Sequence, residues 1–381
     1  MDRGWDVEVD VAAPEVPSRE CLALLARLKV AVVGGGLGGL MAARALARWG
    51  AAVTVYEARA QVGGRVLSDT TFAKGRIIEA GAELIGSIHT RWCALAKEYG
   101  ISLISRMSGD LYRGQQLHQR MVLDKLLTPD EIEALEKQLG DLLRRIAEFA
   151  RDHIGSGNES RPWVQPDLAD FDHMSVAQAL EKHFGAVPGS RLWKAMEVLL
   201  VNDNVARLDQ MSFLALLCLV RGGQTERRAG RPVTIAPDPL MGYWDELEIY
   251  RCGDGCQRLA LAVAEEVRDR PGCHVTRNLG VRRIDLRPPG GGVQVTARST
   301  RNTPFDRWLR EKIPGNPLMD TRRSDYVVFA VPPTVWGDID RSVKTAVPGL
   351  YLASAFAGFG GFNGAIKAGS NAAERILADA Y

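Results

Sequence analysis

Three glycines between an apolar strand and a helix are the residues of this chain whose spacing points most directly to chemistry. Gly34, Gly36 and Gly39 follow the β-branched run 29–33, and the Ala- and Leu-rich segment 40–49 predicts a helix after them. In this arrangement the first glycine permits a tight turn, the second lets a phosphate approach the backbone, and the third lets helix and strand pack closely. The N–H groups and partial positive charge at the helix N-terminus attract phosphates. The spacing therefore predicts a dinucleotide-binding turn.

A carboxylate lies where such a turn needs an acceptor for a ribose. Glu57 follows a second apolar strand, 52–56, and stands 23 residues after Gly34. That position suits a side chain that accepts hydrogen bonds from the adenosine ribose hydroxyls. Strand, turn, helix, second strand and acid together predict nucleotide binding, and a purely structural glycine-rich turn is the alternative. The β-α-β unit by itself is compatible with NAD or FAD.

The elements that must position these residues follow from the apolar pattern. The run 29–33 is continuous rather than alternating, which predicts a buried parallel strand. Over 121–152, Leu and Ile recur at helical spacing, and Thr128 followed by a proline predicts the start of that helix. The other expected helices are 20–28, 175–184, 192–200, 211–220, 259–268 and 364–380, and the other expected strands are 273–276, 281–286, 293–297, 325–331 and 350–353. The centre of the chain, 105–222, is therefore expected to be mainly helical.

Length and composition exclude several classes of protein. The chain has 381 residues, a net charge of +2, 46% hydrophobic residues and 25% charged residues. This is ordinary for a soluble globular protein of two or three domains. The balanced charge gives no electrostatic case for nucleic acid or an anionic membrane as a partner. Residues 1–28 have no apolar core of a secretory signal, and no apolar run is long enough to span a membrane, so a cytoplasmic location is expected.

Six cysteines are scattered along the chain without a dense framework, which favours a reducing compartment. Cys252 and Cys256 are close in sequence but lack a second pair and nearby histidines. Two plain thiols are therefore favoured over a metal site there. The segment 298–323 is basic and is expected to be a solvated loop. No metal site is predicted.

At residues 63–65 the sequence resembles a known family. Gly63, Gly64 and Arg65 follow Glu57 by six residues, and the whole stretch 55–66 looks like the extended FAD signature of the flavin-containing amine oxidases. This family contains the monoamine, polyamine and L-amino acid oxidases. The resemblance implies FAD as the cofactor, with Arg65 facing its phosphates or the flavin edge. Arg59, in the same stretch, is placed among the cofactor-binding residues.

Two further segments carry the resemblance. Residues 79–86 are similar to the family's loop that passes the flavin ring, which implies that Ala82, Glu83 and Leu84 lie close to the flavin. Residues 250–260 resemble the return of the chain into the FAD domain. In the strand that follows, Val281 is implied to recognise adenine through its backbone.

The C-terminal part resembles the family's last FAD motif. Residues 348–353 and 360–366 match it, which implies that Gly364, Ala365 and Ile366 form a helix N-terminus directed at the flavin N1/C2 carbonyl. The family carries Ala-Gly-Glu after the last strand, whereas this chain has Ala, Ser and Ala. Ser354 is therefore expected to replace part of the missing carboxylate's contact with the ribityl chain.

The family also has a long substrate-domain stretch with a lysine bridged through water to flavin N5. Here only residues 334–347 separate the segment 331–333 from Pro348. Lys344 lies in this stretch, but a solvated loop lysine is the favoured interpretation. Two explanations of the short stretch remain open: half of the substrate domain has been lost, or the sequence omits it.

Three residues are candidates for contact with a substrate. Glu83 stands where L-amino acid oxidases commonly carry an arginine, and a carboxylate there would attract an ammonium group. The alternative is that Glu83 pairs with a backbone N–H or an arginine. His89 lies just past the same loop, with a surface histidine favoured instead, and Phe362 lies near the start of the last helix. Arg91 or Arg113 are further candidates for binding a substrate carboxylate.

The resemblance implies an α/β fold in which a discontinuous, Rossmann-like parallel-sheet FAD domain carries an inserted, largely helical substrate domain. The expected parts are a leader at 1–28, FAD-domain segments at 29–104, 245–297 and 324–381, the substrate domain at 105–244, and a basic loop or substrate-domain remnant at 298–323.

The expected function is oxidation of a C–N bond in an amine or L-amino acid. By resemblance, the C–H next to nitrogen delivers hydride to flavin N5, and O2 accepts the electrons and gives H2O2. No catalytic side chain is assigned, because the flavin performs the redox step. The alternatives are a flavin-dependent tailoring oxidase or desaturase of a secondary metabolite, and a non-catalytic FAD-binding homologue with a shortened substrate domain. A homodimer is compatible with each.

Overall fold

The structure is a computed structural model of the 381-residue chain. It describes most of the chain between residues 19 and 376. The described ranges are 19–87, 89–105, 121–122, 125–156, 158–159, 162–204, 206–224, 238–286, 289–301, 303–304, 306, 319–332, 335, 339–341, 350–352, 370 and 372–376.

The described residues divide into two compact units. One contains residues 84–88 and 104–250, and the other contains residues up to 83, 89–103 and 251 onward. The chain changes unit at 103/104 and at 250/251, where the sequence places domain boundaries at 104/105 and 244/245. The sequence analysis did not anticipate that 84–88 groups with the helical unit.

A five-stranded parallel sheet forms the centre of the second unit. Its order is β10-β2-β1-β14-β16, and each neighbouring pair is parallel. Strand β1 is central because its continuous apolar run is suited to burial on both faces. The sequence therefore predicted the parallel sheet correctly. The strands are β1 (Lys29–Val33), β2 (Ala52–Tyr56), β10 (His274–Thr276), β14 (Tyr326–Phe329) and β16 (Leu350–Leu352).

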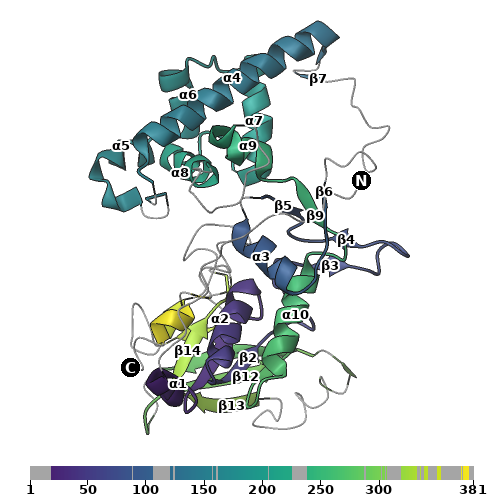
Figure 1. The fold of residues 1–381 in the computed structure, drawn as a ribbon, viewed down its shortest axis with the longest axis vertical. Helices are drawn as coiled ribbons and strands as arrows, with labels where there is room; N and C mark the ends of the chain where they lie inside the picture. The colour runs from purple at the N-terminus through teal and green to yellow at the C-terminus, as the bar shows by residue number, and fades with distance from the viewer. Residues whose placement is uncertain are drawn as a thin grey trace. The chain divides into compact units, whose positions relative to one another are not determined.

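The two faces of this sheet are covered by different layers. Val30 and Val32 of β1 pack into a cluster with residues of the helices, whereas Ala31 and Val33 pack into a cluster with a second sheet. This alternation is the period-two pattern of a strand. Figure 1 shows α2 and α10 side by side on the helical face. The helices of this unit include α1 (Arg19–Leu25), α2 (Leu37–Arg48), α3 (Thr90–Glu98) and α10 (Gln257–Arg268), and residues 372–376 are also helical.

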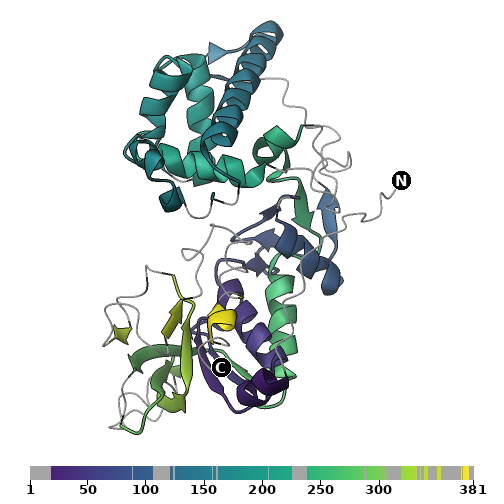
Figure 2. The same cartoon turned by 60° about the vertical axis from the view of Figure 1, so that its left-hand side comes forward.

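The second sheet is mainly antiparallel and has the order β13-β12-β11-β15. Figure 2 shows it, in green, against the parallel sheet. One part of the basic segment 298–323 was predicted wrongly: residues 319–324 form an edge strand rather than a loop. Among the described strands it pairs only with β12, and it exposes Arg322 and Arg323 to solvent, as charged edge strands commonly do. The strands are β11 (Leu279–Asp285), β12 (Val293–Ser299), β13 (Met319–Ser324) and β15 (Asp340–Arg341).

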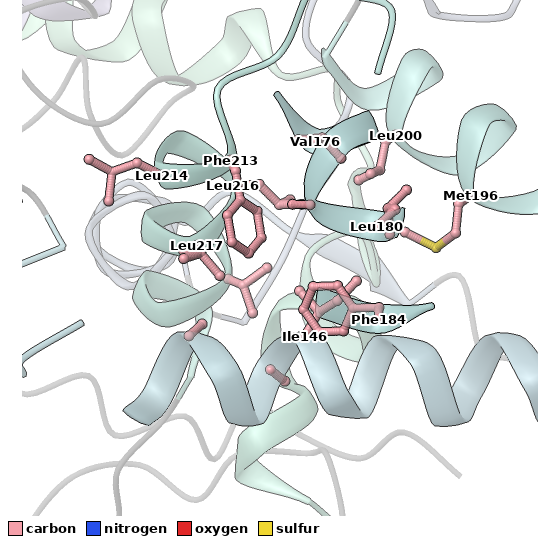
Figure 3. Close-up of a cluster of buried hydrophobic side chains, with 14 of the residues drawn as sticks. Ile146, Val176, Leu180, Phe184, Met196, Leu200, Phe213, Leu214, Leu216 and Leu217 are labelled. Carbon is pink, nitrogen blue, oxygen red and sulfur yellow. The ribbon is translucent and has the colours of Figure 1, made fainter. Parts of the chain in front are cut away.

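The first unit is built from helices around one apolar core. Figure 3 shows Ile146 of α4, Leu180 and Phe184 of α6, and Phe213 and Leu217 of α8 meeting in this core. The mainly helical centre expected from the sequence is therefore present in the described residues. Its helices are α4 (Pro129–His153), α5 (Ala169–Asp172), α6 (Val176–Phe184), α7 (Arg191–Asn204), α8 (Phe213–Gly223) and α9 (Gly242–Glu246), with short 3-10 turns η1 (Pro162–Val164), η2 (Pro166–Leu168) and η3 (Pro239–Met241).

Capping side chains set where two of these helices begin. The Thr128 hydroxyl accepts from the backbone N–H of Glu131, and the Glu131 carboxylate accepts from that of Thr128. Ser175 and Gln178 make the same reciprocal pair before α6. Each pair satisfies N–H groups that have no partner inside the helix.

Short strands complete the described elements. The pairs β3–β4 and β7–β8 are antiparallel hairpin-like ladders, and β5, β9 and β6 form a three-stranded sheet. Among the described residues, no helix is both long and apolar enough to cross a membrane. The strands are β3 (Ser68–Asp69), β4 (Ile78–Glu79), β5 (Leu84–Ile85), β6 (Leu103–Ser105), β7 (Met121–Val122), β8 (Lys125–Leu126) and β9 (Tyr250–Cys252).

Candidate cofactor-binding site

The glycine-rich turn lies between β1 and α2 as predicted from the spacing. Gly34 has a φ of +107°, and its N–H donates to the Tyr56 carbonyl at 2.9 Å. A Cβ on Gly39 would lie 2.0 Å from the Gly34 carbonyl oxygen, far inside van der Waals contact. Side chains at these two positions would therefore either strain the turn or push α2 away from the strand.

The N-terminus of α2 is open to an anion. The N-cap residue is Gly36, which has no side chain to satisfy the first N–H groups of the helix, and the first turn contains no acidic residue. The helix begins at Leu37, three residues earlier than the sequence predicted. Gly38 and Gly39 therefore lie inside its first turn. The backbone N–H groups of this first turn and the positive end of the helix dipole fit a phosphate group at this point.

Glu57 is buried at the end of β2 and holds the turn together. Only 7% of its surface is exposed. Its Oε2 accepts from the backbone N–H of Gly35 at 2.8 Å, and its Oε1 accepts from that of Arg59 at 2.7 Å. A carboxylate oxygen accepts more than one hydrogen bond, so both oxygens retain capacity for ribose hydroxyls. The geometry therefore joins the acid to the glycine turn directly.

The Gly-Gly-Arg turn docks on the same glycine loop. The N–H of Gly63 donates to the Gly35 carbonyl at 2.8 Å, and Gly36 and Gly63 form a parallel bridge. A Cβ on Gly63 would lie 2.3 Å from the Val66 carbonyl oxygen, and its φ is +120°. The Arg59 guanidinium donates to the Gly64 carbonyl at 3.3 Å. Arg65, the third residue of this turn, is exposed.

Gln257 fastens the Gly-Gly-Arg turn to α10. Its side chain is 4% exposed, and its Nε2 donates to the Val62 carbonyl at 2.7 Å. Its Oε1 accepts from the backbone N–H of Ser68 at 3.1 Å. The sequence analysis missed this residue, because its partners lie almost 200 positions away and no local pattern marks them.

A second polar link joins Ser68 of β3 and Glu79 of β4 to the start of α10. The Glu79 carboxylate accepts from the Ser68 hydroxyl at 2.8 Å and from the backbone N–H of Cys256 at 2.7 Å. A carboxylate at a helix N-terminus is favourable for the helix dipole. Glu79 was quoted in the sequence only as the start of the flavin-loop motif, and its role at the helix emerges from the structure.

The expected flavin loop is packed closely on the Gly-Gly-Arg turn. The N–H of Ala82 donates to the Arg65 carbonyl at 3.1 Å, and a Cβ on Gly81 would lie 2.1 Å from that same oxygen. Glu83 forms an ion pair with Arg251. This pairing is the alternative that the sequence left open for Glu83, and it satisfies the carboxylate within the protein. Leu84 begins β5.

The segment after β2 is paired with the start of β11. The N–H of Leu279 donates to the Glu57 carbonyl, and the N–H of Asn278 donates to the Arg59 carbonyl, each at 2.9 Å. Asn278 has a φ of +57°, in the left-handed region that asparagine tolerates. Val281, two residues further along this strand, is buried and pairs with Ala297. The structure thus brings the strand of Val281 to the segment that carries Glu57.

His89 lies directly before α3 and is half-buried rather than on the surface. Burial lowers the pKa of His89 to about 4, because the protonated ring is poorly solvated there. Ser354, Phe362, Gly364, Ala365 and Ile366, together with Lys344 and Arg113, lie outside the described residues. Within the described part of the chain, no group of three or more metal-binding side chains comes together.

Residues 37–336 match the family described as flavin containing amine oxidoreductase. The chain belongs to this family. The match begins at Leu37, the first residue of α2, and spans the Gly-Gly-Arg turn and the polar links to α10. It confirms the family that the motifs indicated.

Individual relatives cover parts of the chain. Putrescine oxidase of Kocuria rosea is 32% identical over 158 residues, which are 40% of this chain and 31% of that protein. Lysine-specific histone demethylase 1 homolog 2 of Oryza sativa is 40% identical over 114 residues, or 29% of this chain and 14% of that protein. Each aligned stretch therefore covers less than a third of the relative's own length.

A solved structure extends the likeness to the fold. Wild-type putrescine oxidase bound to putrescine superimposes with a TM-score of 0.57 at 22% identity, covering 82% of this chain and 60% of that one. At this identity the likeness concerns the fold. It confirms the mixed α/β architecture with a parallel sheet.

Proposed function

We propose that this family member binds FAD and oxidises a C–N bond of an amine to an imine, with O2 as the final electron acceptor. The observation that carries the proposal is the joint placement of the open α2 N-terminus and the buried Glu57 carboxylate on one glycine loop. Membership of the flavin-containing amine oxidoreductase family supports the reaction class.

The residues present fit FAD. The N–H groups at the start of α2 would hold the pyrophosphate, and the Glu57 carboxylate would accept from the adenosine ribose. The exposed guanidinium of Arg65 would balance phosphate charge, and the backbone of Val281 would face the adenine. FAD, when bound, supplies the two-electron acceptor for C–N oxidation. The close packing of Gly81 on the Arg65 carbonyl would fix the loop of Ala82 to Leu84 beside it.

The substrate class is proposed to be amines rather than amino acids. Relatives with the name putrescine oxidase support an amine. Glu83 is not the group proposed to bind the amine's ammonium form, because its carboxylate is already paired with Arg251. Oxidation of an amine requires its uncharged form, because the nitrogen lone pair must assist loss of the adjacent hydride. The chain's task is therefore to hold a neutral amine against the flavin in an apolar setting.

FAD binding without amine turnover is the second candidate function. It is favoured by the short stretch 334–347, where the family resemblance predicts a longer segment with a lysine. The two candidates share the cofactor and differ in whether an amine reduces it.

Product analysis of the purified protein tests the proposal. The bound cofactor is released by denaturation and identified by chromatography, and H2O2 and ammonia are then measured with putrescine and a panel of other primary amines. We expect FAD, and one H2O2 per ammonia released. H2O2 without ammonia would indicate a tailoring oxidase or desaturase instead. FAD with neither product would favour the non-catalytic candidate.

A further inference from the structure

Two cysteines lie at the two ends of one tight turn at the junction of β9 and α10. Cys252 ends β9 and Cys256 is the N-cap residue of α10, four positions later. Interaction with the Cys252 side chain raises the pKa of the Cys256 thiol. The chain between them is a tight turn, since the N–H of Gly255 donates to the Cys252 carbonyl at 3.3 Å. The other described cysteines, Cys93, Cys218 and Cys273, are buried.

The turn that brings the two thiols together is fixed by its neighbours. Gly255 has a φ of +83°, and a Cβ there would lie 2.6 Å from the Ser68 hydroxyl oxygen. The Glu79 carboxylate and the Ser68 hydroxyl accept from the backbone N–H groups of Cys256 and Gln257, respectively. The backbone between the two cysteines is thus held in place by hydrogen bonds to Glu79 and Ser68. A disulfide requires such an approach of the two side chains without a large backbone movement.

The two thiols differ in access to solvent. Cys256 is fully buried, whereas Cys252 is half-exposed. Hydrogen bonding with Cys252, together with burial, raises the pKa of Cys256, so that it remains a protonated thiol. A small oxidant from solvent therefore reaches Cys252 first, and Cys256 is placed to react second. This is the arrangement of an attacking and a resolving cysteine.

We infer that Cys252 and Cys256 form a reversible disulfide in response to hydrogen peroxide. The Cys252 thiolate attacks one oxygen of the peroxide and breaks the O–O bond, which gives a sulfenic acid and, with the thiol's proton, one water. The Cys256 sulfur then attacks the Cys252 sulfur, forms the S–S bond and expels hydroxide, which takes up the Cys256 proton as a second water. Two thiols and one peroxide thus become one disulfide and two waters.

The disulfide would act on the loop next to the expected flavin. The Cys256 thiol donates to the Glu83 carbonyl at 3.3 Å, and the disulfide has no proton for this bond. Oxidation therefore removes one of the contacts that hold the loop of Ala82 to Leu84. The supply of peroxide by the protein itself rests on the proposed function, whereas the reaction of the pair does not. In a reducing compartment such a disulfide is transient, which suits a response to peroxide.

Peroxide added to the purified full-length protein tests the pair without any amine turnover. Treated and untreated samples are alkylated under denaturing conditions and digested with trypsin, which cuts after Arg251 and Arg258 and so places both cysteines in one peptide. We expect the treated peptide to lose both alkyl groups and to be lighter than the free dithiol peptide by two hydrogen atoms. Dithiothreitol should restore both alkyl groups.

Three variants make the result specific. In Cys252→Ser, Cys256 should remain alkylated after peroxide, because its buried thiol has lost the attacking partner. In Cys256→Ser, Cys252 should accumulate as sulfenic and sulfinic acid. Cys273→Ser, which removes a buried lone thiol, should leave the disulfide yield unchanged. Retention of both alkyl groups in the treated wild-type peptide, or direct conversion of Cys252 to sulfinic acid with Cys256 free, would overturn the inference.

Discussion

At the scale of single residues, Glu57 does two things with one carboxylate. It accepts from the backbone of the glycine turn and from the backbone of Arg59, and it stands where a ribose would bind. Because it is buried, removal of the carboxylate leaves two N–H groups without their acceptor. The residue therefore shapes the turn before any cofactor is present.

Replacement of Glu57 by alanine should weaken FAD binding. We expect at least a tenfold increase in Kd, about 1.4 kcal/mol, because the turn loses its brace and the ribose loses its acceptor. Titration of the apoprotein with FAD, followed by quenching of flavin fluorescence, measures this. Glu265→Ala, which removes an exposed carboxylate from α10, is the matched control and should bind FAD as the wild type does. Equal affinity of Glu57→Ala and the control would contradict this role.

His89 should make stability depend on pH. Its pKa is about 4 in the folded protein against an ordinary value of 6.5, so the folded state favours the neutral ring. Protonation below pH 6.5 then favours the unfolded chain, and stability falls as the pH decreases towards 4. Between pH 7 and pH 5 this contribution is about 2 kcal/mol. Urea unfolding of the wild type and of His89→Gln at pH 7 and pH 5 measures this contribution. The free energy of unfolding should change less between the two pH values in the variant. An equal change in both proteins would refute the role of His89.

At the scale of elements, an ion-pair network joins α2, α10 and the C-terminal end of α3. Glu266 of α10 bonds to Arg44 and Arg48 of α2 and to the Tyr99 hydroxyl after α3, and Glu98 of α3 bonds to both arginines. Burial raises the pKa of Glu266, but the hydrogen bonds from Arg48, Tyr99 and Arg44 outweigh it and lower the pKa to about 2. The network thus holds α2, whose N-terminus forms the expected phosphate site.

Replacement of Glu266 by glutamine should destabilise this unit. We expect a loss of about 2–3 kcal/mol at pH 7, because partly buried arginines lose their counter-charge. The stabilisation is present above the ordinary glutamate pKa of 4.5 and is lost as the pH falls towards 2, so the two proteins should converge in acid. Glu265→Gln, one residue earlier and exposed, is the control. A Glu266→Gln melting curve that matches the control at pH 7 would exclude a structural role for the network.

The capping box of α4 makes a prediction for the helical unit. Thr128→Ala removes the acceptor for the Glu131 N–H and should lower the free energy of unfolding by about 1 kcal/mol. Thr128→Ser keeps a hydroxyl acceptor and should lose much less stability. Urea unfolding followed by circular dichroism at 222 nm, which reports helix, compares the two. Equal losses in both variants would show that the hydroxyl cap is not the cause.

At the scale of the whole molecule, local patterns predicted the sheet and its glycine turn. Continuous apolar runs place β1, β2 and β14, and the spacing of Gly34 to Gly39 places the turn, because both depend on neighbouring residues. Contacts between distant segments could not be predicted in this way. Gln257 meets Val62, and Glu83 meets Arg251, through the tertiary fold alone. The strand β13 was missed because its charged residues lie on an exposed edge.

The cofactor half and the amine half of the proposal have different support. The family match ends at residue 336, and the chain covers 60% of the putrescine oxidase structure. The cofactor side of the proposal therefore rests on described contacts, and the amine side rests on family membership. The most direct test must address both at once.

The measurement that does so is the visible spectrum of the purified protein during anaerobic titration with amines. The account predicts a flavin absorption band that is present after addition of FAD and bleaches with at least one amine, since the amine's electrons then remain on the flavin. No flavin band even with added FAD would contradict the assignment of the glycine turn and Glu57 to FAD. A stable band with every amine in the panel would contradict amine oxidation.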